Sequence, residues 1–217
     1  MKFAKSLLEA CLVAVTLSLP AAAADAEFDR LLDEVRATWA TINYRTPEPQ
    51  RVAAFEKLMT KSADFAKRYP SRPEALIWDG IVASTYAGAR GGIGALTPAK
   101  LARTRFEQAL EIDEKALDGS AHTSLGTLYH KVPGFPIAFG NDRKARTHLE
   151  QALAIAPAAI DANFFFAELL YDEGEYERAL RHLETAKRAP PRPCCEIADA
   201  GRHAEIDALI RKVKDEL

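Results

Sequence analysis

The feature that most constrains this fold is a pattern of small and large residues that returns with a period of about 34 residues. The clearest copy spans residues 160–191 and ends at Pro191. Its small residues are Ala167, Ala179 and Ala186, and its larger residues are Leu170, Tyr176 and Leu183. Two antiparallel helices need small residues where their backbones approach, larger ones between them, and a proline to end the second helix. Each copy therefore predicts one helical hairpin, and successive hairpins are expected to stack and bury a shared core.

A second copy, over residues 119–159, is split by an insertion. Its first helix carries Ala121, Leu125, Gly126 and Tyr129, and its second carries Ala145, Leu149, Ala152, Leu153 and Pro157. Residues 131–142 lie between them and hold two prolines and two glycines, which predict a loop. Asn141 or Asp142 is expected to cap the helix that follows.

A weaker third copy lies upstream, over residues 73–115. Its helices carry Ala75, Leu76, Gly80 and Ala83, then Ala102, Phe106, Ala109 and Leu110. Ser71-Arg72-Pro73 is expected to begin the first helix. The extra length predicts a second inserted loop over 86–97, after which Thr97 caps the next helix and Pro98 takes its first position.

The flanking segments also show helical periodicity. Residues 25–70 predict a further hairpin, either a degenerate repeat or a cap, with helices over 27–44 and 49–69. After the break at 189–193, residues 194–217 predict a capping helix over about 197–216. Its apolar stripe would cover the last repeat, and its polar face, which includes Arg202, would meet solvent. The expected fold class is all-α, with about nine helices and no strand.

The repeated frame resembles the tetratricopeptide repeat (TPR) family. That resemblance implies a right-handed solenoid of antiparallel helix pairs, with a concave groove lined by positions 2, 5, 9 and 12 of each first helix. Those positions hold Glu74, Ile77, Ile81 and Ser84, then Ser120, Thr123, Thr127 and His130, then Asp161, Phe164, Glu168 and Tyr171. This mixture suits a peptide, a small organic ligand or a neighbouring subunit. The alternative is that the inserted loops bury some of these side chains.

Both inserted loops leave from the same turn of their repeats, so they are expected along one rim of the solenoid. Phe135, Ile137 and Phe139 place apolar side chains on that rim. The hypothesis is that the loops fold over the groove or dock a partner. Replacing Phe135 and Phe139 by serine would then weaken binding.

The first 24 residues have the pattern of a cleaved export signal. Lys2 and Lys5 precede an apolar run over 7–19, and Ala22–Ala24 predict cleavage before Asp25. The run is short for a bilayer span and contains Glu9, which disfavours a retained membrane helix. The expected location is the periplasm, where cysteines usually pair.

Only Cys194 and Cys195 would remain after cleavage. Adjacent cysteines close a strained ring, so the sequence favours two thiols in a proline-rich turn over an intrachain disulfide. An intermolecular bridge, or a soft-metal contact that adds His203, stays open. His148 and His182 share a frame position and are expected to be neighbours on the outer surface.

The sequence shows no pattern that predicts catalysis, a metal site or a cofactor. The glycine-rich segment 88–94 lacks the Gly-Lys-Ser/Thr ending of a phosphate-binding loop, and the histidines form no metal-ligand motif. A formal net charge of −2 argues against binding to nucleic acid. We therefore expect a non-enzymatic protein that binds protein partners.

A narrower resemblance lies in 125–129, which read Leu-Gly-Thr-Leu-Tyr, and in the residues that follow: Pro133-Gly134, Gly140, Asp142, Lys144-Ala145-Arg146 and Ala152-Leu153. They are similar to the T-component proteins of TRAP transporters, periplasmic helical repeat proteins that partner a substrate-binding protein. The leading expectation is an exported interaction scaffold of the cell envelope. The alternative is a periplasmic accessory ligand-binding component of a solute transporter.

Overall fold

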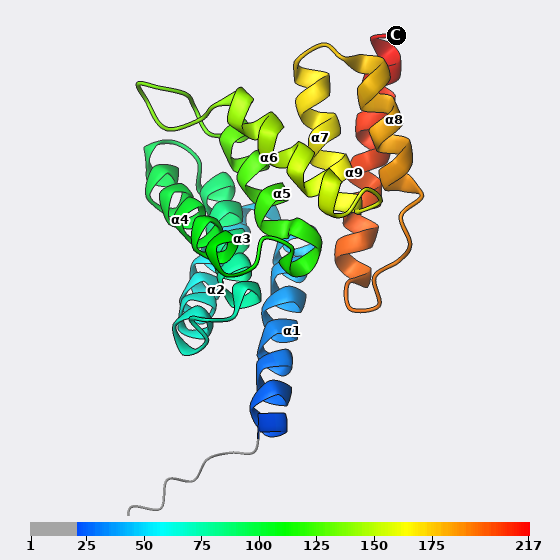
Figure 1. The fold of residues 1–217 in the computed structure, drawn as a ribbon. Helices are drawn as coiled ribbons and strands as arrows, with labels where there is room; N and C mark the ends of the chain where they lie inside the picture. Colours follow the sequence, from blue (N-terminus) through cyan, green and yellow to red (C-terminus); the bar gives the residue numbers. More distant parts are fainter. Residues whose placement is uncertain (1–20) are drawn as a thin grey trace, which may run out of the picture.

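The computed structural model describes residues 21–217, which form nine α-helices and one short 3-10 helix (Figure 1). In chain order they are α1 (Ala21–Arg45), α2 (Glu48–Arg68), α3 (Pro73–Arg90), η1 (Ile93–Ala95), α4 (Leu96–Ile112), α5 (Ala116–Lys131), α6 (Asp142–Ile155), α7 (Ile160–Asp172), α8 (Tyr176–Lys187) and α9 (Glu196–Asp215). Within this part of the chain no strand forms, and one isolated bridge joins Gly134 and Gly140. The all-α prediction is confirmed.

The predicted export signal lies mostly outside the described residues, which begin at Ala21. Residues 21–24 form the first turn of α1. No helix in the range 21–217 has the length and apolarity needed to cross a bilayer.

Three helical hairpins, α3–α4, α5–α6 and α7–α8, occupy the residues of the three proposed repeats. Gly80, Gly126 and Ala167 share position 8 of the repeat frame, where the first helix of each hairpin meets the second. They show why small residues are required there. A Cβ atom added to Gly80 would lie 2.5 Å from the ring of Phe106, and one added to Gly126 would lie 2.6 Å from Leu149 Cγ. Ala167 takes the same position in the third hairpin and is fully buried. A larger side chain at any of these positions would separate the two helices.

The predicted helix ends are partly confirmed. Asn141 caps α6, because its side-chain oxygen accepts a hydrogen bond from the backbone N–H of Lys144 at 2.9 Å. Pro73 begins α3 as expected. Residues 132–141 form the second inserted loop.

The first inserted loop, predicted over 86–97, is much shorter than expected. Helix α3 continues to Arg90 because Tyr86 and Ala87 are buried in the core. The chain turns only at Gly91 and Gly92, whose φ angles of 63° and 58° suit glycine, and η1 follows. Thr97 lies inside the first turn of α4 and does not cap it; Ala95 precedes the helix without a side-chain cap.

Two hydrophobic clusters make the core, and α3 contributes to both. The smaller cluster joins α1, α2 and α3 around Phe28, Phe55 and Val82. The larger one runs through the three hairpins to Ile206 and Val213 of α9. Helices α1 and α2 contact each other, and both contact α3.

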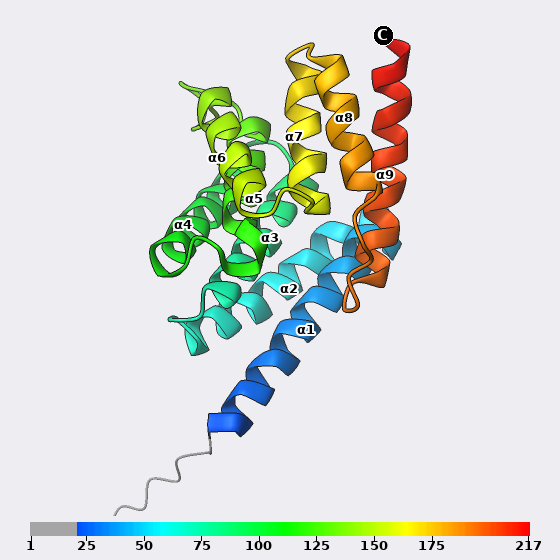
Figure 2. The same cartoon turned by 45° about the vertical axis from the view of Figure 1, so that its right-hand side comes forward.

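The inner helices close on themselves, which the repeat frame did not predict. α1, α3, α5, α7 and α9 each contact the next, and α9 also contacts α1. Figure 2 shows the C-terminal end of α1 beside α9. Gly201 of α9 faces Tyr44 of α1 so closely that an added Cβ atom would lie 2.2 Å from the tyrosine ring.

This closure corrects the expected role of the C-terminal helix. Arg202 was assigned to a solvent-facing surface, yet it is only 8% exposed. It faces α7, where it binds the carboxylate of Asp161. The helix therefore packs against both helices of the last hairpin, α7 and α8, and also against α1.

Candidate functional site

The predicted groove positions lie on the inner helices, but they are not equally accessible. Ile77, Thr123 and Phe164 are buried. The remaining positions are partly exposed: Glu74, Ile81, Ser84, Ser120, Thr127, His130, Asp161, Glu168 and Tyr171. Helix α9, and not an inserted loop, covers Phe164, since the Arg202 guanidinium carbon lies 4.4 Å from its ring centre.

The inner face opens between α7 and α9, at a cavity of about 320 Å³. Phe164, Phe165 and Glu168 line it from α7. From α9 it is lined by Arg202, Glu205, Ala208, Leu209 and Lys212. Two predicted groove residues therefore meet in one cavity with residues that the repeat frame did not indicate. We call this cavity the α7–α9 mouth.

Arg202 organises the α7–α9 mouth. Its Nε donates to Asp161 at 2.8 Å and its Nη1 donates to Glu205 at 2.6 Å. The guanidinium also lies 4.4 Å from the ring centres of both Phe164 and Phe165. Burial opposes its charge, but Asp161 and Glu205 more than offset that cost and raise the pKa of Arg202.

Asp161 is shared by two arginines. Arg192, in the segment between α8 and α9, binds Asp161 through Nη1 at 2.7 Å and Asp199 through Nε at 2.7 Å. Burial alone would raise the pKa of Asp161, but Arg202 and Arg192 lower it below its ordinary value. The carboxylate is therefore held in its charged form, and it links α7 to the α8–α9 connection through Arg192 and to α9 through Arg202.

Tyr44 brings α1 to this network. Its hydroxyl donates a hydrogen bond to Glu205 at 3.4 Å. Burial raises the pKa of Tyr44 to about 12, so the phenol stays protonated at neutral pH. Burial also raises the pKa of Glu205. The mouth thus has charged groups, held by hydrogen bonds, around the rings of Phe164 and Phe165.

Two groove residues, Glu168 and His130, take part in contacts between α5 and α7. Glu168 lies 3.4 Å from Lys131, and His130 lies 2.9 Å from Asp172. These contacts join α5 to α7 on the inner face. They do not bring His130 into the α7–α9 mouth.

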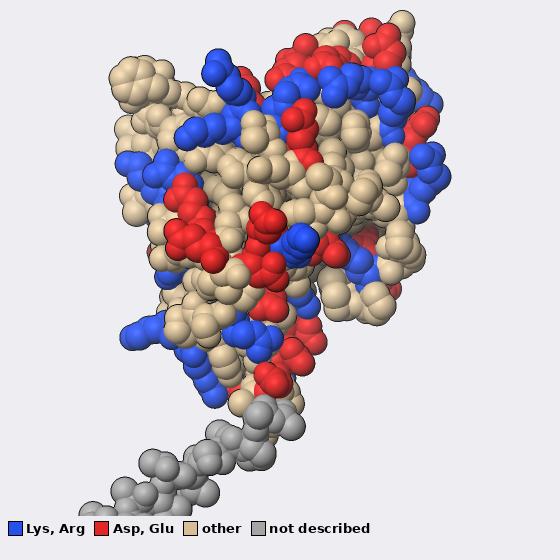
Figure 3. All heavy atoms as spheres, in the orientation of Figure 1, with Lys and Arg blue, Asp and Glu red and all other residues tan. Residues whose placement is uncertain are grey.

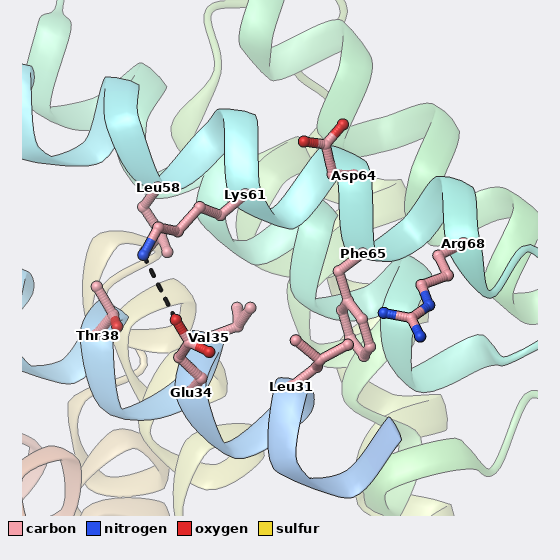
Figure 4. A pocket seen from close by; sticks show the side chains of 9 residues that line it. All are labelled: Leu31, Glu34, Val35, Thr38, Leu58, Lys61, Asp64, Phe65 and Arg68. Carbon is pink, nitrogen blue, oxygen red and sulfur yellow. Dashed lines mark hydrogen bonds and ion pairs between the residues drawn. The ribbon is translucent and has the colours of Figure 1, made fainter. Parts of the chain in front are cut away.

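A second cavity, of about 280 Å³, opens between α1 and α2 (Figure 4). Its apolar lining comes from Leu31, Val35, Leu58 and Phe65, and Lys61 crosses it to reach Glu34 at 3.4 Å. None of its lining residues belongs to a predicted groove position. The α7–α9 mouth is therefore the better candidate for the inner-face site.

The loop over 132–141 does not fold over the inner face. It projects from the α5–α6 hairpin (Figure 1), and Phe135 and Ile137 are 93% and 69% exposed. Phe139 is different: it packs edge-on against Tyr129 with ring centres 5.9 Å apart, and Arg103 lies over its other side at 4.5 Å. Phe139 thus anchors the loop against Tyr129 and Arg103, and the other alternative of the rim hypothesis, that the loops dock a partner, stays a prediction.

Cys194 and Cys195 form an intrachain disulfide, contrary to the sequence expectation. They lie where the proline-rich connection enters α9, held by the hydrogen bonds from Arg192 to Asp199. In this turn the two sulfurs lie together, although disulfides between adjacent cysteines are rare. Between residues 21 and 217 no group of three His, Cys, Asp or Glu side chains could hold a metal ion.

The histidine prediction is also wrong. His148 does not pair with His182; its Nδ1 lies 3.0 Å from Nδ1 of His122, and its ring stacks on Tyr129. His182 bonds to Asn163 instead. His148 and His182 hold the same frame position on two second helices. Each of them faces the first helix of its own hairpin and not the second helix of the next hairpin.

The His122–His148 pair predicts acid sensitivity. Burial, followed by the nearby His122 and Lys144, lowers the pKa of His148 from 6.5 to about 4. The unfolded chain then binds more protons than the folded chain between these values, so stability falls as the pH drops from 6.5 toward 4. We expect a loss of about 2 kcal/mol from this site. Urea unfolding of the wild type and of His148→Gln at several pH values measures it. Equal pH dependence in both proteins would contradict the assignment.

Several residues of the mouth could not be found from the sequence. Arg202, Glu205 and Lys212 look like an ordinary solvated helix face. The one available signal is Gly201, because glycine inside an amphipathic helix often marks a close approach of another backbone or ring. The structure shows that the approaching ring is that of Tyr44.

The comparisons with known proteins agree with this architecture. No curated protein matches the chain. Residues 137–193, which contain α6, α7 and α8, match the model of the family described as tetratricopeptide repeat. This part of the chain is therefore similar to a tetratricopeptide repeat, and it contains the α7–α8 hairpin.

Proposed function

We propose that this protein is an exported, non-enzymatic scaffold that holds a partner protein in the cell envelope through the α7–α9 mouth. The single observation that carries the proposal is the aromatic cavity of about 320 Å³ on the inner face, ringed by charged groups whose positions ion pairs already fix. TPR domains commonly mediate protein–protein interactions, and the family match overlaps α7. Export is supported by the sequence pattern of the first 24 residues.

The chemistry of the mouth indicates the kind of segment that it binds. Phe164 and Phe165 offer an apolar floor, while Lys212 is exposed at the edge and Glu168 and Glu205 are partly exposed. An extended peptide with one apolar side chain and flanking charged residues matches these groups. Because ion pairs hold Glu168, Arg202 and Glu205 before binding, these side chains lose little entropy when the peptide enters.

Filling the mouth tests the proposal. Ala208 lines the cavity, whereas Ala204, one turn earlier in α9, is exposed and does not line it. We expect Ala208→Trp to reduce partner capture at least tenfold, because the indole occupies the space of the partner's anchor side chain. Ala204→Trp is the matched control and should capture the partner as the wild type does.

The experiment is affinity purification of the chain from its native envelope, followed by identification of what co-purifies and by titration of that partner. The same purified chain yields its first residue, for which we expect Asp25. Equal capture by the two tryptophan variants would place the partner elsewhere. A chain that retains Met1 would remove the export part of the proposal and leave the binding part standing.

The size of the cavity favours one alternative, an accessory ligand-binding component of a TRAP-type solute transporter. A volume of about 320 Å³ falls in the range of sites for small organic molecules. Native mass spectrometry distinguishes the two functions: a small molecule retained by the wild type and by Ala204→Trp, but lost from Ala208→Trp, favours the alternative. Transporter subunits encoded next to this chain would favour it too.

A further inference from the structure

On one edge of the solenoid, large apolar side chains at the tips of two turns are exposed to solvent. Five large apolar side chains of the described residues are exposed, and three of them lie in the α3–α4 and α5–α6 turns. These are Ile93, at 89% exposure, with Phe135 and Ile137 of the projecting loop. Exposing such side chains to water is unfavourable, so their position on two adjacent turns needs an explanation.

The projecting loop is held rigidly at its base. The Gly140 backbone N–H donates to Pro133 at 2.9 Å, and that of Asn141 donates to Tyr129 at 2.8 Å. Phe139 is fixed between Tyr129 and Arg103 of α4. The contact with Arg103 also ties the loop to the helix that follows η1. The exposed side chains of Phe135 and Ile137 therefore lie on a loop whose base is already structured, and not on an unstructured segment.

The same two turns are strongly basic. Residues 88–100 and 131–144 hold five cationic side chains and one carboxylate, a net charge of +4, although the whole chain carries −2. The cations are Arg90, Lys100, Lys131, Arg143 and Lys144, and the carboxylate is Asp142; Lys131 also pairs with Glu168 and Asp172 of α7, outside these two segments. Every one of these six side chains is exposed. Figure 3 shows Lys and Arg side chains beside the apolar tip of the loop.

We propose that this edge, which we call the basic rim, binds the surface of an anionic phospholipid bilayer. The three apolar tips enter the interface between headgroups and acyl chains, and the surrounding cations lie against the phosphates. Lys and Arg suit this arrangement because their aliphatic stems can lie along apolar surface while their charges stay in water. The inference goes beyond the proposed function, since the basic rim and the α7–α9 mouth use different residues.

A bilayer explains the rim better than a protein partner does. A specific protein interface buries about 800 Å² on each side around a continuous apolar centre. Here the apolar groups are separate tips on two turns, and the same two segments carry the cations. A fluid surface can accept isolated tips without a matching shape, and its negative charge complements the excess of cations.

Vesicle flotation with the full chain tests the apolar part of the proposal. We expect the wild type to float with vesicles of phosphatidylcholine mixed with phosphatidylglycerol, and much less with phosphatidylcholine alone. Phe135→Ser combined with Ile137→Ser should lower the partition coefficient about tenfold. The matched control is Ile112→Ser with Leu217→Ser, two exposed apolar residues away from the rim, which should change partition less than twofold.

Charge neutralisation tests the electrostatic part. Lys100→Gln with Arg143→Gln should weaken binding to anionic vesicles about tenfold at low salt, and the difference should shrink as salt screens the surface. Lys57→Gln with Lys67→Gln, on exposed positions of α2, is the control and should have little effect. Equal losses in the two pairs would show an effect of net charge alone and would overturn the proposal.

A direct readout identifies the inserting residue whatever else attaches the chain to lipid. Tryptophan at position 135 should be quenched by brominated lipid in anionic vesicles, whereas tryptophan at position 112 should not be. Absence of quenching at position 135 overturns the proposal. So does retention of vesicle binding by Phe135→Ser/Ile137→Ser together with loss of a co-purifying protein, because the rim would then be a protein-docking surface. Failure of the Ala208→Trp experiment affects only the proposed function.

Discussion

Replacing Arg202 by methionine should lower the free energy of unfolding by about 3–5 kcal/mol. The side chain is 8% exposed and binds Asp161 and Glu205 through different nitrogens. Methionine fills much of the volume of the arginine side chain, but it carries no charge. The partly buried carboxylates of Asp161 and Glu205 then share less positive charge. Lysine should not restore the loss, since a single ammonium cannot reproduce the fork that reaches both carboxylates and stacks on Phe164 and Phe165.

Urea unfolding measures this effect, with Arg211→Met as the matched control. Arg211 is exposed on the same helix, so its replacement should change stability by no more than about 0.5 kcal/mol. Adding Asp161→Asn to Arg202→Met should recover part of the loss, because one of the uncompensated charges is removed. A loss below about 1 kcal/mol for Arg202→Met would mean that the network is effectively solvated, as surface ion pairs are.

Gly201→Val should separate α9 from α1 and cost about 2–3 kcal/mol. An added Cβ atom at this position would lie 2.2 Å from Cδ1 of Tyr44, an atom near the base of the ring that cannot simply swing away. The closed arrangement of inner helices would open at this contact. Small-angle scattering should therefore show a larger radius of gyration together with the loss of stability.

Gly88→Val provides the control for this substitution. Gly88 also lies inside a helix, but an added Cβ atom there meets no atom within 4 Å. It should leave both the size and the stability of the protein close to those of the wild type. Combining Gly201→Val with Tyr44→Ala should relieve the clash, so the double variant should be more stable than the two separate losses predict. Additive losses, or an unchanged radius for Gly201→Val, would argue against the contact between α1 and α9.

The helices and their pairing could be predicted because their signals are local. Gly80 and Gly126 mark points where two helices of one hairpin touch, and the asparagine cap at 141 depends only on the next three residues. The length of the first inserted loop was less accessible. Glycines over 88–94 suggest a break, but burial of Tyr86 and Ala87 keeps α3 helical up to Arg90. Tertiary packing there outweighs local preference.

The candidate site was predictable only in part, for a similar reason. Phe164 and Glu168 follow from the repeat frame, because the frame fixes which face of α7 points inward. Phe165 lies next to the predicted position but outside the frame. The disulfide between the two adjacent cysteines follows from no frame position either; it lies in the turn that Arg192 and Asp199 bridge before α9.

By itself, the sequence determined that this protein folds as stacked helical hairpins, because helix periodicity and hairpin contacts involve residues close together in the chain. Only the tertiary structure decided that α9 returns to α1 and turns Arg202 inward, away from solvent. Each hairpin is rotated slightly relative to the one before it, and these small rotations add up along the chain to the curvature that brings α9 back to α1. The sequence of a single repeat does not reveal that sum. The same curvature places Tyr44 against Gly201, 157 positions later in the chain, and so creates the α7–α9 mouth.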